Sequence, residues 1–213
     1  MLKILFAMFV VFTVVRVTWF FLGRHMTPGR MYHHTYRFLV VLGSGGHTSE
    51  MLMMLKQFGE KNDRIDWTFV VADSDTTSIP RIPVVLGEDF AYTVIRTPRI
   101  RNVGESFVWA ILRLPLILIN SVKIVSHTDP DVLITNGPGT CVPIIVGACI
   151  VQIFSIAFKR IFCVFVESFC RVKTVSLSGK IVYPLVDKFL LQWPPTADVS
   201  KKYPHAVYRG RIL

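Results

Sequence analysis

The chain has 213 residues, which is enough for one domain of ordinary size and leaves little room for a second. Apolar residues make up 52% of it, which allows a full core and leaves a surplus that indicates contact with a membrane or a partner. The formal net charge of +10 favours anionic ligands, but the basic residues are scattered without interleaved aromatic residues, which argues against a nucleic-acid binder.

The first predicted element is an apolar helix over Ile4–Leu22, which has about the 20 residues that a helix needs to cross a bilayer. The one charge inside it, Arg16, lies about 9 Å from the end of the segment, so we expect its side chain to extend to the interface. The apolar stretch is too long for a cleavable signal peptide, and no small-residue cleavage site follows it. Arg24, Arg30 and Arg37 follow the segment, so the positive-inside rule predicts that the rest of the chain faces the cytosol.

The remaining chain is predicted to form one domain. We assign residues 1–23 to a membrane anchor, 24–36 to a linker and 37–213 to the domain. Short apolar runs in the domain predict six strands: Phe38–Leu42, Trp67–Asp73, Tyr92–Arg96, Asp131–Asn136, Arg160–Glu167 and Lys188–Gln192. Because these runs are continuous rather than alternating, both faces of each strand should be covered. Strand–helix alternation then predicts an α/β fold with a single Rossmann-like, doubly wound parallel sheet.

Helical patterns separate the strands over Glu50–Phe58, over Phe107–Val125 with a kink expected at Pro115, and from near Pro143 onward. Phe107–Val125 and the charge-free stretch Cys141–Phe158 are apolar enough to be further membrane spans. Sheet-covering helices are the preferred interpretation, because the second stretch directly follows a strand and a Gly-Pro-Gly turn. Shallow contact of this surface with the bilayer is compatible with that preference and stays open.

The four cysteines lie inside apolar runs, which predicts buried, reduced thiols for Cys141, Cys149, Cys163 and Cys170. They form no C-x-x-C pair, and no histidine cluster has zinc spacing, so we expect no metal site.

The turn GSGGH joins the first strand to the first helix of the domain, and it comprises Gly43, Ser44, Gly45, Gly46 and His47. A bare turn at a helix N-terminus presents backbone N–H groups and the positive end of the helix dipole, which favours an anion such as phosphate. The turn lacks the lysine and spacing of a Walker A loop, and the last position of G-x-G-x-x-G falls on Thr48, so ATP and NAD fit poorly. A tight turn without a ligand stays the alternative. His47 could orient a phosphate or accept a proton, or it could be purely structural.

A second turn of the same kind follows the fourth strand, in the sequence TNGPGTCVP. Its candidate binding residues are Asn136, Gly137, Gly139 and Thr140. Because parallel strands end at one edge of the sheet, where ligands bind, the two turns can frame a single cleft. Two unrelated tight turns are the alternative.

The segments LGSGGHTSEML, NGPGTCVP, VFVESFCRV and QWPP…YRGRIL together resemble the membrane-anchor subunit of the endoplasmic-reticulum UDP-N-acetylglucosamine transferase. That enzyme adds the second GlcNAc to GlcNAc-diphosphodolichol in N-glycan assembly. The resemblance covers nearly the whole chain, and the domain is also similar to the acceptor-binding half of the bacterial GlcNAc transferase MurG.

The resemblance implies one half of a GT-B glycosyltransferase, located at the endoplasmic-reticulum membrane as a single-pass protein. A small cytosolic catalytic subunit would supply the other half and hold most of the UDP-GlcNAc donor. This chain would hold the lipid-linked acceptor GlcNAc-diphosphodolichol and no tightly bound cofactor, and it would be inactive alone. Whether a divalent cation is needed is left open.

The resemblance also implies roles for residues. The two glycine turns would bind the acceptor diphosphate, and His47 would be the candidate base on the sugar hydroxyl. Arg96, Arg99 and Arg101 would clamp the diphosphate or a headgroup, unless they form a solvated loop. Glu167 would be a second candidate for the catalytic machinery, where it would bind sugar, or it would pair with an arginine. The tail residues Tyr208, Ile212 and Leu213 would dock the catalytic subunit, unless the tail is frayed.

Two rival functions stay open at this point. The chain would be a pure membrane scaffold for the catalytic subunit if its cleft were vestigial. It would be a complete short glycosyltransferase if it turned over UDP-GlcNAc unaided.

Overall fold

The computed structural model describes residues 2–23, 35–59, 64–100, 107–137, 139–155 and 160–210. A seven-stranded sheet forms the centre of the domain, in the order β3-β2-β1-β4-β5-β6-β7, and every neighbouring pair is parallel. The strands are β1 (Tyr36–Val41), β2 (Ile65–Ala72), β3 (Thr93–Thr97), β4 (Val132–Thr135), β5 (Phe162–Val166), β6 (Lys188–Leu191) and β7 (Ala206–Tyr208).

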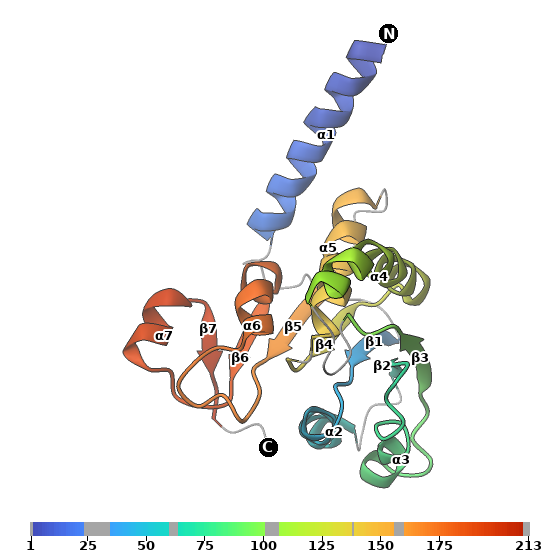
Figure 1. The fold of residues 1–213 in the computed structure, drawn as a ribbon, viewed down its shortest axis with the longest axis vertical. Helices are drawn as coiled ribbons and strands as arrows, with labels where there is room; N and C mark the ends of the chain where they lie inside the picture. The colour runs from blue at the N-terminus through green and yellow to red at the C-terminus, as the bar shows by residue number, and fades with distance from the viewer. Residues whose placement is uncertain are drawn as a thin grey trace.

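Helices cover both faces of this sheet, as Figure 1 shows. The helices are α1 (Leu2–Gly23), α2 (Gly46–Gly59), α3 (Arg81–Leu86), α4 (Phe107–Thr128), α5 (Cys141–Phe154), α6 (Leu177–Val182), a 3₁₀ turn (Tyr183–Leu185) and α7 (Ala197–Lys202). α2 and α3 lie on one face, α4, α5 and α6 lie on the other, and α1 projects away from the domain (Figure 1). The predicted doubly wound parallel sheet is therefore confirmed.

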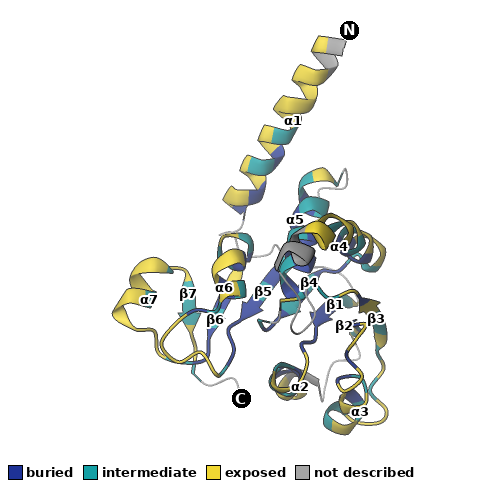
Figure 2. Cartoon of the chain, viewed as in Figure 1, coloured by how far each residue is buried: buried dark blue, intermediate teal, exposed yellow. Residues whose placement is uncertain are grey.

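Two apolar clusters, one on each face, hold the layers together. Leu39 and Val41 of β1 pack with α4 and α5, whereas Val40 of β1 and the following Leu42 pack with α2 and α3. All four side chains are almost fully buried, so the strand has no polar face. This two-sided burial is the physical reason for the continuous apolar runs, and β1 and β5 at the centre of the sheet are largely dark blue in Figure 2.

All six predicted strands are present, with ends shifted by at most two residues, and β1 begins at Tyr36 inside the predicted linker. The sequence did not predict α3, α6, α7 or β7. These elements have three to six residues each, too few for a hydrophobic period to be recognised.

The two apolar stretches of the domain are sheet-covering helices, as preferred. α5 buries eight of its residues, and α4 packs on it and runs through Pro115 as one continuous helix. Their close contact depends on Gly147, where an added Cβ would lie 3.0 Å from the backbone of Ser121. Among the described residues, α1 is the one helix long and apolar enough to cross a membrane.

Arg16 corrects one expectation. Its side chain does not extend towards the end of α1 but is 1% exposed and lies against the end of α5. The guanidinium donates to the carbonyls of Ile153 and Ser155 at 2.8 Å each, and also to that of Gln152. The last carbonyls of a helix lack partners within the helix and carry partial negative charge. They therefore bind the guanidinium close to its own position on α1, and the side chain does not reach for the membrane–water interface.

The cysteine prediction is right for three residues and wrong for the fourth. Cys141, Cys149 and Cys163 are buried free thiols. Cys170 is also free but exposed, and it lies in a turn after β5 and not in a buried strand or helix.

Candidate functional site

The two glycine turns lie next to each other because of the strand order. β1 pairs with β2 on one side and with β4 on the other, so the chain reverses its direction of winding between β1 and β4. Ligands of doubly wound sheets bind at such a point, beyond the carboxyl ends of the strands. A hydrogen bond joins the turns directly, since Asn136 Nδ2 donates to the carbonyl of His47 at 2.6 Å.

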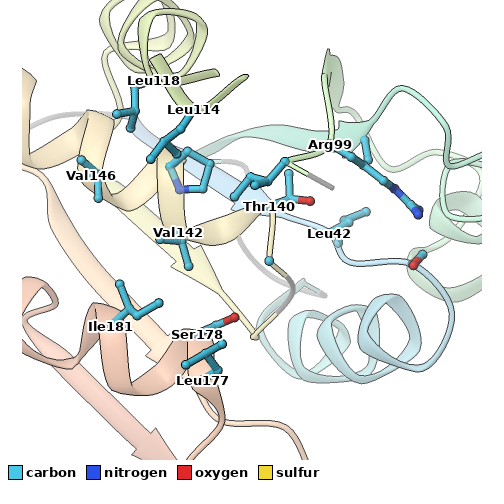
Figure 3. A pocket seen from close by; sticks show the side chains of 15 residues that line it. Leu42, Arg99, Leu114, Leu118, Thr140, Val142, Val146, Leu177, Ser178 and Ile181 are labelled. Carbon is cyan, nitrogen blue, oxygen red and sulfur yellow. The ribbon is translucent and has the colours of Figure 1, made fainter. Parts of the chain in front are cut away.

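A cleft of about 660 Å³ opens beside the turns (Figure 3). Its polar end contains Ser44 from the first turn, Gly139 and Thr140 from the second, and Arg99 after β3. The apolar walls come from three helices: Leu114 and Leu118 of α4, Val142 and Val146 of α5, and Leu177 and Ile181 of α6. The polar groups of the cleft thus gather where the strands end, beside Leu42, Ala72 and Ile100, whereas the walls between the helices are mainly apolar.

Both turns need glycine at one position and face open space at others. Gly45 has φ +66° and Gly137 has φ +84°, values that residues with a Cβ adopt only at a cost in steric strain. A Cβ added at Gly45, Gly46 or Gly139 would meet no atom within 4 Å. The first amides of α2 and α5 lie within or directly after these turns and have no partners within the regular helical ladder, although Ser49 and Val142 donate to the carbonyls of Gly45 and Gly139. The arrangement therefore presents N–H donors where a bulky anion has room.

The first turn is fixed from behind by a polar network that the sequence did not reveal. The carbonyl of Gly43 accepts a hydrogen bond from the Thr48 hydroxyl, and Ser78 Oγ lies 3.2 Å from it. The two hydroxyl oxygens are 2.5 Å apart, and Ser78 donates its proton to Asp75 Oδ2 at 2.6 Å. Arg81 completes the support, because it donates to the carbonyl of Gly45 at 3.2 Å.

Asp75 is the charged centre of this network. Its Oδ1 accepts hydrogen bonds from the amides of Thr77 and Ser78 and from the Thr77 hydroxyl. Burial by itself would raise the pKa of Asp75, but the hydrogen bonds from Ser78 and Thr77 outweigh it and hold the pKa below the ordinary 3.8. The carboxylate therefore stays ionised and keeps its donors ordered at neutral pH.

His47 lies at the start of α2, half-buried beside the second turn. Its Nδ1 is buried 3.8 Å from Glu50 Oε2, and neither atom has a hydrogen-bond partner. The other carboxylate oxygen of Glu50 accepts from the Ser168 hydroxyl at 3.2 Å. This leaves Nε2 as the imidazole nitrogen that a substrate hydroxyl can reach, with a carboxylate behind the ring to stabilise an imidazolium.

Glu167 is placed differently from the catalytic role expected of it. It is 1% exposed, and its carboxylate accepts from the amides of Ser168 at 3.1 Å and Ser176 at 2.9 Å. Gly179 makes room for it, since an added Cβ there would lie 2.6 Å from Oε2. Among the described residues no arginine pairs with it. The geometry assigns Glu167 to holding the start of α6, not to contact with a ligand.

The thiol of Cys141 lies close to the second turn but is unsuited to nucleophilic chemistry. It is fully buried, and this burial, more than any other cause, raises its pKa to about 12. The thiol is thus protonated at physiological pH and serves the core.

The expected arginine clamp is only partly in place. Arg99 lines both the cleft and a smaller cavity of about 420 Å³ that also contains Arg113. Arg96 instead donates to the carbonyl of Asp73 at 3.2 Å and is not among the described residues that line the cleft. Arg101 lies outside the described residues.

The predicted docking tail begins on the last strand. Tyr208 ends β7, pairs with Leu191 of β6 and is 38% exposed. Ile212 and Leu213 lie outside the described residues.

Sequence reasoning missed three functional candidates near His47 and the first turn: Glu50, Asp75 and Ser168. Glu50 had a local signal, because a carboxylate three residues after a histidine on a helix shares its face. Asp75 also had a local signal, because an aspartate followed by Thr77 and Ser78 can accept hydrogen bonds from their amides. Ser168 had none, since it meets Glu50 only through the packing of distant elements.

Solved structures share this fold. MurG from Acinetobacter baumannii has a TM-score of 0.54 at 12% identity, with 83% of this chain and 45% of that chain covered. The UDP-GlcNAc 2-epimerase from Neisseria meningitidis has a TM-score of 0.55 at 13% identity, covering 83% of this chain and 47% of that one. The chain spans less than half the length of both, as one lobe of a two-lobed GT-B fold would.

Curated relatives match much more closely. The UDP-N-acetylglucosamine transferase subunit ALG14 of Mus musculus is 37% identical, with 92% of this chain and 90% of the relative covered. The human subunit of that name is 36% identical over 95% of this chain and 93% of its own length. Residues 38–212 match the sequence model of the family described as "Oligosaccharide biosynthesis protein Alg14 like". With both turns, the sheet and the β7 tail inside that match, the chain belongs to the Alg14 family of oligosaccharide biosynthesis proteins.

Proposed function

We propose that this chain is the membrane-anchored, acceptor-binding subunit of a UDP-N-acetylglucosamine transferase of N-glycan synthesis. Its acceptor is GlcNAc-diphosphodolichol, to which the complex adds the second GlcNAc. The observation that carries the proposal is the shape of the cleft, with two glycine turns at one end and apolar helices along its sides. A diphosphate attached to a sugar and to a polyprenyl chain has the same division into polar and apolar parts.

The polar end suits the diphosphate. Ser44, Gly139 and Thr140 line it next to the helix N-termini, and Arg99 adds a positive charge. Backbone amides and an arginine are the donors that bind phosphate oxygens in many proteins. The apolar walls of α4, α5 and α6 suit the first isoprene units, which gain by leaving water.

The donor sugar needs a second lobe. The names of the relatives describe a subunit. This chain has one parallel sheet, and it matches less than half of the MurG chain and of the epimerase chain. We assign UDP-GlcNAc mainly to a small cytosolic catalytic partner, which docks against the tail from Tyr208 to Leu213. The chain itself holds no cofactor tightly in this proposal.

The proposed chemistry uses His47 as the base. Its Nε2 takes the proton of the acceptor sugar hydroxyl while the hydroxyl oxygen forms a bond to C1 of the donor GlcNAc. The bond from C1 to the UDP oxygen breaks, and UDP leaves with that electron pair. Glu50, 3.8 Å from Nδ1, stabilises the imidazolium that forms.

The proposed location is the endoplasmic-reticulum membrane with the domain in the cytosol. α1 supplies the single span, and Arg24, Arg30 and Arg37 follow it on the cytosolic side. The cytosolic side is where a soluble catalytic partner and a nucleotide sugar are both accessible.

Reconstitution tests the proposal. GlcNAc transfer to a diphospholipid acceptor is measured with this chain, with the partner, and with both, and transfer is expected from the pair alone. Ile181 lines the apolar part of the cleft and is 46% exposed, so Ile181→Trp should narrow the cleft without disturbing the core. This variant should raise the KM for the lipid acceptor. Val84→Trp, on α3 and 77% exposed, is the matched control and should change nothing.

Three outcomes contradict parts of the account. Unchanged kinetics in Ile181→Trp, together with unchanged activity when His47 is replaced, means that the chain is a scaffold without a role in acceptor binding. Transfer by this chain alone means that it is a complete glycosyltransferase. Transfer by the partner alone at the full rate removes the need for this chain in the reaction.

A further inference from the structure

The contact between Arg16 and α5 fixes where the domain lies along α1. Arg16 comes seven residues before Gly23, the last residue of α1, which is about 10 Å along the helix axis. Its guanidinium holds the carbonyls of the last turn of α5, and Phe12 and Trp19 flank it at 6.0 Å and 5.4 Å. The end of α5 is thus held beside the body of α1, not beyond its end.

This position has a consequence if α1 crosses a bilayer, as proposed above. α1 has 22 residues, about 33 Å, and needs nearly its whole length to cross a hydrocarbon core of about 30 Å. Arg16 and the end of α5 must then lie below the headgroups. Burial of Arg16 against three carbonyls is the arrangement expected of a cation at that depth, where an unpaired charge is costly.

The neighbouring surface of α4 is apolar and uncovered. Leu112, Leu116 and Ile119 are 62%, 70% and 54% exposed, and their spacing of four and three residues puts them on one face of the helix. Phe154, at the end of α5, is 48% exposed. α4 and α5 lie on the side of the sheet from which α1 projects, and exposed parts of α4 are yellow in Figure 2.

We propose that Leu112, Leu116, Ile119 and Phe154 form a second membrane-contacting surface, which enters the same leaflet as the cytosolic end of α1. The occupant of this surface is the lipid bilayer. Arg16 is the clamp that joins the two parts, so α1 is a rigidly attached element and not a flexible tether. The side of the domain that α4 and α5 form then faces the bilayer, and the cleft between α4, α5 and α6 lies close to it.

Charge and continuity favour lipid over a protein partner. α4 contains Arg113, Lys123 and no acidic residue, which suits a helix lying among anionic headgroups with its apolar face down. Both cations are exposed: Arg113 directly follows Leu112, and Lys123 comes four residues after Ile119. The surface is also continuous with α1 through the end of α5, so lipid that surrounds α1 at the depth of Arg16 also reaches Phe154.

Depth-dependent fluorescence quenching tests the proposal on the full chain in liposomes of phosphatidylcholine and phosphatidylserine. Cys170→Ser removes the exposed thiol, and single cysteines for a polarity-sensitive label are added as Met8→Cys, Leu116→Cys, Phe154→Cys and Val84→Cys. Nitroxide-labelled lipid should quench the labels at 8, 116 and 154, whereas iodide in the buffer should quench the label at 84. Met8 lies in α1 and is 64% exposed, and Val84 is the solvent control on α3.

The pattern of quenching tests the second membrane-contacting surface separately from the proposal that α1 is a membrane anchor. A label at 8 that lipid does not quench means that α1 does not cross the bilayer. Lipid quenching at 8 with iodide quenching at 116 and 154 overturns the second surface alone. Protection at 116 and 154 from both quenchers means that protein covers them, which also overturns it. Arg16→Leu should keep the quenching at 8 and lose it at 154, and retained quenching at 154 contradicts the role of the clamp.

Discussion

Asn136 Nδ2 donates a hydrogen bond of 2.6 Å to the backbone carbonyl of His47, and this bond ties the turn after β4 to the first turn of α2. Asn136 is fully buried, so the bond is not exchanged with water. It sets the position of His47 relative to the second glycine turn, and the geometry of the candidate site depends on it.

Asn136→Ala should therefore lower transferase activity strongly while it lowers the free energy of unfolding only modestly. The loss of one neutral hydrogen bond costs about 1 kcal/mol of unfolding free energy, measured by chemical denaturation. Asn120→Ala is the matched control, because Asn120 donates to the Thr97 hydroxyl at 3.2 Å outside the cleft lining. Equal activity in the two variants means that the bond between the turns does not serve the reaction.

Gly137→Ala should reduce activity through the same turn. The residue has φ +84°, and the added Cβ would lie 3.7 Å from His47 Cε1, so the strain of about 1–2 kcal/mol falls beside the proposed base. Gly87→Ala imposes comparable strain at φ +107° after α3 and should leave kcat unchanged. If both variants lose activity in proportion to their loss of stability, the turn has no specific role.

His47→Ala should lower kcat by roughly 10²–10⁴-fold, the range for loss of a general base, while partner binding is retained. Glu50→Gln should give a smaller loss of kcat with an unchanged KM for UDP-GlcNAc, because Glu50 acts through the imidazole. Glu50→Asp should recover part of the loss. His127→Ala, an exposed histidine near the end of α4, is the control. A full rate in His47→Ala removes His47 from the mechanism.

Much of this site follows from local sequence, and part of it does not. The run before Gly43 and the run before Asn136 each predict a buried strand, and the rule that parallel strands end at one edge brings the two turns together. The partner of Arg16 was not predictable, because it depends on how α1 packs on a helix more than 130 residues away. The surroundings of Glu167 were not predictable for a related reason. A carboxylate at the end of a strand suggests contact with a ligand, and only the packing of Gly179 and the hydrogen bond from Ser176 show that it is enclosed.

Stability should depend on pH through Asp75. Its pKa is lowered on folding, so its contribution is fully present above 3.8, the value in an unfolded chain, and is lost as the pH falls through the lower folded value. The difference in unfolding free energy between the native chain and Asp75→Asn should shrink as the pH falls from 5 to 3. Asp66→Asn, at an exposed position, should show no such convergence. A constant difference for Asp75→Asn contradicts the network as described.

Deletion of residues 209–213 should release the catalytic partner from membranes. The truncation retains Tyr208, so β7 keeps its pairing with β6, and the thermal midpoint of the chain should not change. The measurement is co-sedimentation of the partner with membranes that carry the full or the shortened chain. Normal co-sedimentation with the shortened chain refutes docking through the tail.

Photocross-linking tests the central claim most directly. A GlcNAc-diphosphate-polyprenol with a diazirine on its first isoprene unit is activated in membranes that contain the full complex. The account predicts adducts on cleft residues of α4, α5 and α6, such as Leu118, Val146 and Ile181, which unlabelled acceptor suppresses. Adducts confined to the partner subunit, or to surfaces of this chain outside the cleft, contradict acceptor binding here.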